Sequence, residues 1–293
     1  MLIDSFCLIL GCVKRFVIFG LCLALLGCQK KEAKNLPRCI YDQPAFSQCA
    51  AAFIADDVQF AQFKRNPFFN LLWENLSKEE GEMWLGKVES EHPEILAYLE
   101  ALRESDFVGS PRVFDYGRVG SFSPSTLRLA VIGAEIRSRV GSLKEKKVVQ
   151  IGAGYGGLCR VLHVFEKVGS YTIVDLEEQL QLAKKYLEAF GLHEVTYLTP
   201  DQLLTKQEYD LVVSDGSFSE FARADQEVFF ERILTKSSSG YLLGHVFPKH
   251  YGVVPLSTQE IQARFVGKGS YARWEFHEPK VDNENYFVFW KEE

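Results

Sequence analysis

The chain has 293 residues, of which 47% are hydrophobic, enough to bury the core of one large domain or of one domain with a smaller cap. The formal net charge is -6 and the pI is near 5.7, so a nucleic-acid backbone is not expected as a partner. The seven cysteines form no CxxC pair, and we therefore expect no zinc or other metal site.

The first 28 residues have the layout of an export signal. Lys14 and Arg15 precede an apolar run that ends in "LLGC", Leu25–Cys28. This ending resembles a bacterial lipobox, in which Cys28 is lipidated and becomes the new N-terminus. An uncleaved signal anchor is the alternative, although the run is shorter than the roughly 20 apolar residues of a spanning helix. In both cases we expect this segment to attach the protein to a membrane.

A polar tether over residues 29–43 and a helical cap over residues 44–108 are expected next. Cys39 and Cys49 could form a disulfide if the chain is exported, but two unrelated thiols fit equally well. Within the cap, Ser77 is followed three positions later by a glutamate, the pattern of a capping box. The cap's many aromatic side chains are expected to pack on the main domain.

Residues 109–293 are expected to form an α/β domain. A Gly-, Ser- and Pro-rich loop leads into a helix at 125–139. Strands are then expected at 147–151, 171–175, 194–198, 209–214, 239–246, 271–277 and 285–290. Helices are expected at 156–167, 178–190, 222–235 and 258–265. This alternation predicts a Rossmann-like, seven-stranded sheet that is mostly parallel, and its last two strands, which have no helix between them, should pair antiparallel.

A glycine-rich turn, "GAGYGG" at Gly152–Gly157, follows the first of these strands. It fits the G-x-G-x-x-G loop of dinucleotide-binding folds and also the G-x-G-x-G loop of methyltransferases that use S-adenosyl-L-methionine (SAM). Asp175, at the end of the next strand, would suit ribose hydroxyls in either class. The long helical region before the loop and the antiparallel end of the sheet favour the methyltransferases over a nicotinamide-dependent oxidoreductase. No Walker lysine follows the glycines, which excludes a P-loop.

Five segments in this order are similar to the sugar O-methyltransferases, a SAM-dependent family. They are "VVQIGAGYGGLCRVL", "YTIVDLEEQLQLAKKYLEAFGL", "YDLVVSDGSFSEFARADQEVFFERIL", "SGYLLGHVF" and "EPKVDNENYFVFW". The resemblance covers roughly Gly109–Trp290. The chain departs from the family at Gln150, where a glutamate is usual, and at Asp215, where an asparagine is usual.

This resemblance implies a set of residues that hold SAM: Gln150, Gly152, Gly154, Gly156, Asp175, Leu176 and Asp201. The glycines would face the methionine part and the ribose. Asp175 would accept hydrogen bonds from the ribose hydroxyls, and Leu176 would contact the adenine. Asp201 would bind the adenine amino group, or would serve instead as a helix N-cap.

Methyl transfer to a hydroxyl requires that the acceptor be held close and lose a proton. The polar groups expected near this point are Asp215, Ser217, Ser219, Glu220 and His245. His245 is the preferred base because histidine exchanges a proton near neutral pH, with Asp215 or Glu220 as alternatives, and each of them could instead be structural. Arg112, Tyr116 and Arg128 could line an acceptor pocket.

Two hypotheses of different classes follow. The first is a SAM-dependent O-methyltransferase whose partner is a sugar, a glycan or another small hydroxylated molecule. The second is a non-catalytic envelope lipoprotein that has kept the methyltransferase fold. The export-like segment favours the second, because SAM is made in the cytoplasm, whereas the glycine loop and Asp175 favour the first.

Overall fold

The computed structural model describes residues 38, 42, 44–204, 207–245, 253–265 and 285–291. The expected signal with Cys28, most of the tether at 29–43 and the strand at 271–277 lie outside these residues. Cys49 has a free thiol, and its candidate partner Cys39 also lies outside the described residues. None of the helices within these ranges is both long enough and apolar enough to cross a membrane.

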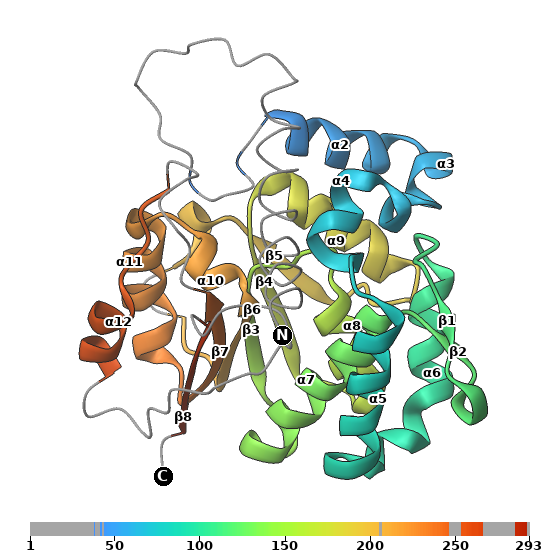
Figure 1. The fold of residues 1–293 in the computed structure, drawn as a ribbon. Helices are drawn as coiled ribbons and strands as arrows, with labels where there is room; N and C mark the ends of the chain where they lie inside the picture. Colours follow the sequence, from blue (N-terminus) through green and yellow to red (C-terminus); the bar gives the residue numbers. More distant parts are fainter. Residues whose placement is uncertain are drawn as a thin grey trace, which may run out of the picture.

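A twisted sheet forms the centre of the molecule (Figure 1). Over the described residues it has six strands in the order β5-β4-β3-β6-β7-β8. Their bounds are β3 Lys147–Ile151, β4 Ser170–Val174, β5 Val195–Leu198, β6 Leu211–Gly216, β7 Ser239–His245 and β8 Asn285–Lys291. The first five pair parallel, and β8 runs antiparallel to β7. The predicted α/β fold, a parallel sheet that ends in an antiparallel pair, is confirmed. The antiparallel partner of β8 in the described sheet is β7. The structure describes six strands where seven were expected, because the strand at 271–277 and its pairing with 285–290 lie outside the described residues.

Helices cover both faces of the sheet, as alternating side chains along each strand require. Val148 belongs to the core on one face, and Val149 to the core on the other. The first face is covered by α7 Pro124–Val140, α8 Gly157–Phe165 and α9 Glu177–Glu188. The second face is covered by α10 Ser217–Glu220, α11 Arg223–Arg232 and α12 Thr258–Phe265 (Figure 1). Each of the predicted helices is found, with bounds shifted by at most a few residues.

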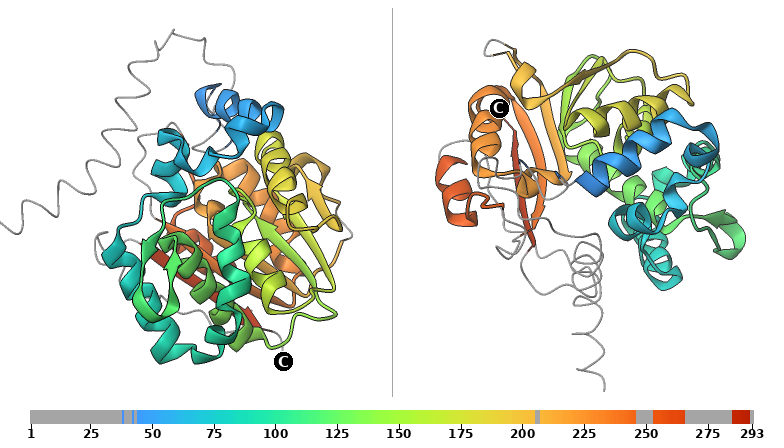
Figure 2. Two further views of the ribbon diagram at one scale, coloured as in Figure 1. Left: turned by 90° about the vertical axis from the view of Figure 1, so that its right-hand side faces the viewer. Right: turned by 90° about the horizontal axis from the view of Figure 1, so that it is seen from above.

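The first of the N-terminal helices packs on α9, and this part of the chain shares the core of the sheet (Figure 2). Phe46, Phe53 and Phe69 belong to the same buried cluster as Val148. The elements are α2 Pro44–Ala55, α3 Asp57–Phe60, η1 Phe63–Arg65, α4 Pro67–Phe69, η2 Asn70–Glu74, α5 Lys78–Glu91, η3 Pro93–Tyr98, α6 Leu99–Arg103 and η4 Glu104–Phe107. The elements up to η2 continue this core, whereas α5, η3 and α6 pack with α7 in a separate buried cluster. A domain boundary at residue 108 stays a prediction.

The remaining elements are short connections. They are the hairpin β1 Phe114–Asp115 and β2 Ser121–Phe122 and the single turns η5 Gly117–Val119, η6 Pro200–Gln202 and η7 Leu234–Lys236. The capping box at Ser77 is confirmed: its backbone N–H donates to Glu80 over 2.7 Å, and its hydroxyl accepts from the Glu80 N–H over 3.2 Å. Such caps fix where each helix begins and therefore where its buried face points.

Candidate functional site

The glycine loop joins β3 to α8 at the carboxyl edge of the sheet. Gly152, Gly154 and Gly156 have φ angles of +81°, +51° and +92°, a region that favours glycine. A Cβ on Gly152 would lie 2.0 Å from the Cβ of Ser217, so the loop touches the corner between β6 and α10. A Cβ on Gly154 would lie 3.1 Å from Nε1 of Trp73. The glycines therefore let the backbone approach two other elements closely.

Asp175 follows β4 and holds the glycine loop in place. One carboxylate oxygen accepts the N–H of Ala153 over 2.6 Å, and the other accepts the N–H of Leu176 over 2.7 Å. Burial raises the pKa of Asp175 to about 6, although the two backbone hydrogen bonds oppose this shift. Leu176 is the N-cap residue of α9 and packs against the core that contains Val149. Asp175 therefore holds the loop through its hydrogen bond with Ala153, which the sequence does not reveal.

Gln150, in β3, also supports the glycine loop. Its side-chain N–H donates to the carbonyl of Gly152 over 2.7 Å, and its oxygen accepts the hydroxyl of Tyr171 over 2.7 Å. The side chain is buried, with 3% of its surface exposed. Gln150 shapes the turn in this structure, and a direct contact with a cofactor stays a prediction.

A cavity opens between the glycine loop, α9, α10 and the N-terminal helices. Its lining residues are Trp73, Gly154, Asp175, Gln179, Ser217, Glu220 and Phe221. Of these, Trp73, Gln179 and Phe221 were not predicted. Gln179 leaves a signal in the sequence, a polar residue on an otherwise apolar helix face, whereas Trp73 could not be told from the other aromatic residues of the cap. Among the described residues that line the cavity, two are acidic and none is a lysine or arginine.

The corner between β6 and α10 gathers two candidate bases. A Cβ on Gly216 would lie 2.9 Å from Nε2 of His245 and 3.8 Å from Oε1 of Glu220, so both groups face the same space. Ser219 links the corner to β7, since its hydroxyl donates to the carbonyl of Gly216 over 2.6 Å and accepts the N–H of His245 over 2.9 Å. The structure therefore brings Ser219, Glu220 and His245 together, and of these three Glu220 lines the cavity.

Asp215 forms an ion pair with Arg128 that the sequence does not reveal. Both carboxylate oxygens accept from the guanidinium, at 2.8 and 2.5 Å. Asp215 thus has a cationic partner on α7, and its role as an alternative base stays a prediction. Arg128, a candidate for lining an acceptor pocket, ties α7 to the sheet edge, and a contact with an acceptor stays a prediction.

Three other candidates do not line the cavity. The side chain of Asp201 is 76% exposed and lies 2.6 Å from the guanidinium of Arg38. Thr199, and not Asp201, is the N-cap of the short η6 turn. Arg112 stacks on a phenylalanine ring, and Tyr116 packs against α5. An adenine contact by Asp201 stays a prediction.

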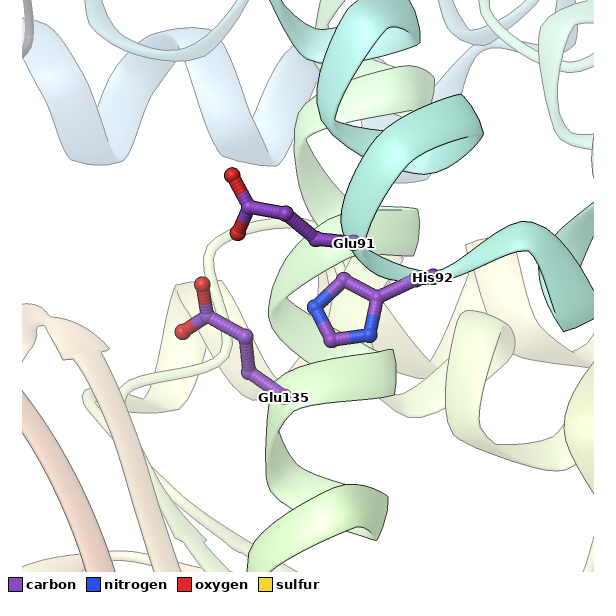
Figure 3. A group of neighbouring side chains, drawn as sticks. All are labelled: Glu91, His92 and Glu135. Carbon is purple, nitrogen blue, oxygen red and sulfur yellow. The ribbon is translucent and has the colours of Figure 1, made fainter.

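A separate group of potential metal ligands is formed by Glu91, His92 and Glu135. One ligand atom from each lies within 4.8 Å of the others, and Figure 3 shows the two carboxylates side by side with the imidazole next to them. Glu135 also accepts the hydroxyl of Tyr241 over 2.6 Å, and Nδ1 of His92 lies 3.6 Å from Glu94. Because both buried members have partners within the protein, we assign no ion to this group.

No protein-family model and no curated protein matches the chain. Many solved structures do, at low identity. The N-terminal domain of EvdMO1, crystallised in the presence of SAH and D-fucose, is 15% identical; the match covers 69% of this chain and 97% of that one, with a TM-score of 0.44. A candidate S-adenosyl-L-methionine-dependent methyltransferase from Methanococcus maripaludis is 21% identical, with 56% and 84% covered and a TM-score of 0.39. The methyltransferase domain of bacterial CtHen1-C is 16% identical, with 57% and 97% covered and a TM-score of 0.41. Likenesses at this level carry no argument about activity, which has to rest on the site itself.

Proposed function

We propose that the protein binds SAM and transfers its methyl group to a hydroxyl of a sugar or another small hydroxylated acceptor. The observation that carries this proposal is the cavity beside the glycine loop, where Asp175 and Glu220 are the charged lining residues. The carboxylate of Glu220 would attract a ligand with a sulfonium and an ammonium and would repel the pyrophosphate of a dinucleotide, whereas Asp175 would suit the ribose of either ligand. When bound, SAM supplies a methyl group on a positively charged sulfur.

The residues of the chain would bind the cofactor and remove the proton from the acceptor. The glycine loop and Asp175 would hold the cofactor at the carboxyl edge of the sheet, where ligands of such folds bind. His245, with Glu220 beside it, would take the proton from the acceptor hydroxyl. A positioned base of this kind speeds transfer by about 10²–10⁴-fold. The ion pair of Arg128 with Asp215 would hold α7 against the end of β6, next to these groups.

Calorimetry on the purified protein tests the cofactor. We expect SAM and S-adenosylhomocysteine (SAH) to bind and NAD not to bind. Asp175→Ala should weaken SAM binding by about 1–3 kcal/mol, because it leaves the N–H groups of Ala153 and Leu176 without their acceptor. Binding of NAD without heat from SAM would overturn the proposal. If SAM binds, a screen of sugars for SAH release then identifies the acceptor.

The export-like segment supports a second candidate, a membrane-attached lipoprotein that keeps the fold without catalysis. Lys14, Arg15 and the run that ends at Cys28 motivate it. We therefore propose that the first 27 residues are removed and that Cys28 is lipidated. The several acyl chains of a lipoprotein would then hold the protein stably at the membrane. Mass spectrometry of the mature N-terminus tests this, and an unmodified peptide that retains Leu26, Gly27 and Cys28 would contradict it. A lipidated protein that binds no SAM would favour this second candidate.

A further inference from the structure

The carboxamide of Gln179 is buried beside the cavity without a hydrogen-bond partner. Only 3% of this residue is exposed, and neither Oε1 nor Nε2 has a partner within the part of the chain that the structure describes. The side chain lines the cavity together with Asp175 and Gly154. Buried amides are nearly always paired, because leaving the donor and the acceptor unsatisfied is costly. This amide therefore points to a ligand that completes its hydrogen bonds.

The position of Gln179 on α9 indicates a role in binding, because packing alone does not require a glutamine there. Leu182, Ala183 and Tyr186 lie three, four and seven residues further along and are fully buried, so they define the apolar face of the helix. Gln179 is on the same face, in the first turn, where the helix meets the cavity. An apolar side chain would satisfy the packing there, and a glutamine adds only its two polar groups.

We infer that Gln179 binds the vicinal diol of the cofactor's ribose, through its N–H₂ to one hydroxyl and through its oxygen to the other; this inference rests on the proposed SAM binding. A hydroxyl both donates and accepts, and so matches both halves of a carboxamide. An ammonium only donates and a carboxylate only accepts, so either one would leave half of the amide unpaired. Asp175, the residue expected to bind the ribose, already has one backbone N–H on each oxygen. Asp175 then orders the loop and keeps one lone pair on each oxygen for the cofactor, and Gln179 adds the two hydrogen bonds that recognise the diol.

The test is a double-mutant cycle between Gln179 and the two hydroxyls. Calorimetry would measure SAH, 2′-deoxy-SAH and 3′-deoxy-SAH against the wild type, Gln179→Leu and a control, Gln181→Leu. Gln181 is an exposed residue on the same helix, and its side chain donates to Glu177 over 2.9 Å. We expect the wild type and the control to bind SAH at least about tenfold more tightly than they bind one or both deoxy analogues. Gln179→Leu should bind SAH about tenfold more weakly and bind the analogues and SAH alike.

Thermal unfolding of the ligand-free protein separates a binding role from a structural one. Gln179→Leu removes an unpaired buried amide, so its melting temperature should equal or exceed that of the wild type. A lower melting temperature together with unchanged discrimination between SAH and the deoxy analogues would overturn the inference.

Two further outcomes can be told apart. If Gln179→Leu instead loses discrimination between SAH and an analogue whose adenine lacks the 6-amino group, the amide reads the base and the diol assignment is wrong. If the wild type binds no SAH, the proposed function fails and the inference fails with it. Intact SAH binding with an unaltered cycle overturns the role of Gln179 alone.

Discussion

The guanidinium of Arg128 donates to both carboxylate oxygens of Asp215, over 2.8 and 2.5 Å. Arg128 lies near the start of α7, and Asp215 lies 87 residues later, next to the end of β6. Their side chains are 20% and 15% exposed, so the pair is largely shielded from water. Bidentate pairs of this kind are strong and directional. The pair fixes α7 against the sheet edge at which the candidate bases lie.

Removal of the cation should destabilise the fold more than neutralisation of the acid. Arg128→Met leaves a carboxylate partly buried without its cation, and we expect it to lower the free energy of unfolding by about 1–3 kcal/mol. Asp215→Asn keeps one acceptor and should cost less. Urea unfolding measures both, and the exposed Arg112→Met should change stability by less than about 0.5 kcal/mol. Equal stability of Arg128→Met and the wild type would show that the ion pair contributes nothing.

Replacement of His245 should slow methyl transfer without affecting cofactor binding. His245→Ala is expected to reduce turnover by about tenfold or more, because the acceptor hydroxyl loses its base. SAH release measures turnover, and calorimetry should find SAM affinity nearly unchanged. His193→Ala, at an exposed histidine, is the matched control. If His245→Ala turns over at the parent rate, then Glu220 or proximity alone provides the catalysis.

A methyl group on Gly152 should disrupt the site beyond the cost of backbone strain. Gly152 and Gly141 have φ angles of +81° and +83°, so alanine at either position costs about 1–2 kcal/mol in strain. Only at Gly152 would the new Cβ collide, 2.0 Å from the Cβ of Ser217, whereas at Gly141 it meets open space. Gly152→Ala should therefore be the less stable variant in urea and should lose SAM binding. Equal losses in the two variants would contradict the contact with Ser217.

Cofactor affinity should fall as the pH drops below about 6. The pKa of Asp175 is raised to about 6 in the folded protein, so below that pH the carboxyl group is neutral and accepts the backbone N–H of the loop more weakly. The loop is then less ordered, and affinity should decrease by up to about tenfold per pH unit. Calorimetry between pH 5 and pH 8, about three units, tests this, and Asp175→Ala should lack the dependence. A flat profile in the wild type would rule out this role for the carboxylate.

The same pKa has a consequence for the ligand-free protein. Because the folded pKa lies above the ordinary value of 3.8, the folded state binds more protons than the unfolded state between about pH 4 and pH 6. The contribution of Asp175 to stability is therefore present below about pH 4 and is lost as the pH rises to about 6. The stability difference between the wild type and Asp175→Ala should shift in this direction over that range.

Trp73 should report ligand binding by its fluorescence. Its indole lines the cavity and lies beside Gly154, whereas Trp84 and Trp290 are buried in the cores with 1% of their surface exposed. SAH should change the emission of the wild type, and Trp73→Phe should lose this change while calorimetry still detects binding. The same spectral change in Trp73→Phe would place the signal elsewhere.

The sequence by itself determined the features that depend on residues close together in the chain. The strand at 147–151 and the helix at 258–265 have the predicted bounds, because apolar periodicity and capping residues act over a few positions. The glycine loop was found for the same reason, since its conformation requires glycines at fixed spacing. The parallel direction of the first five strands was also predicted, because alternating strands and helices leave few other topologies.

Partners that lie far apart in the sequence were decided only by the tertiary structure. The ion pair of Arg128 with Asp215 and the contact of Trp73 with Gly154 join segments that meet only when α7 and the N-terminal helices pack on the sheet. Asp175 was recognised, but its hydrogen bonds with the loop were not, because they depend on how β3 and β4 are paired. The unpaired amide of Gln179 is of the same kind: a helix periodicity places it on the buried face, but only the packed structure determines which polar atoms come near it and which do not.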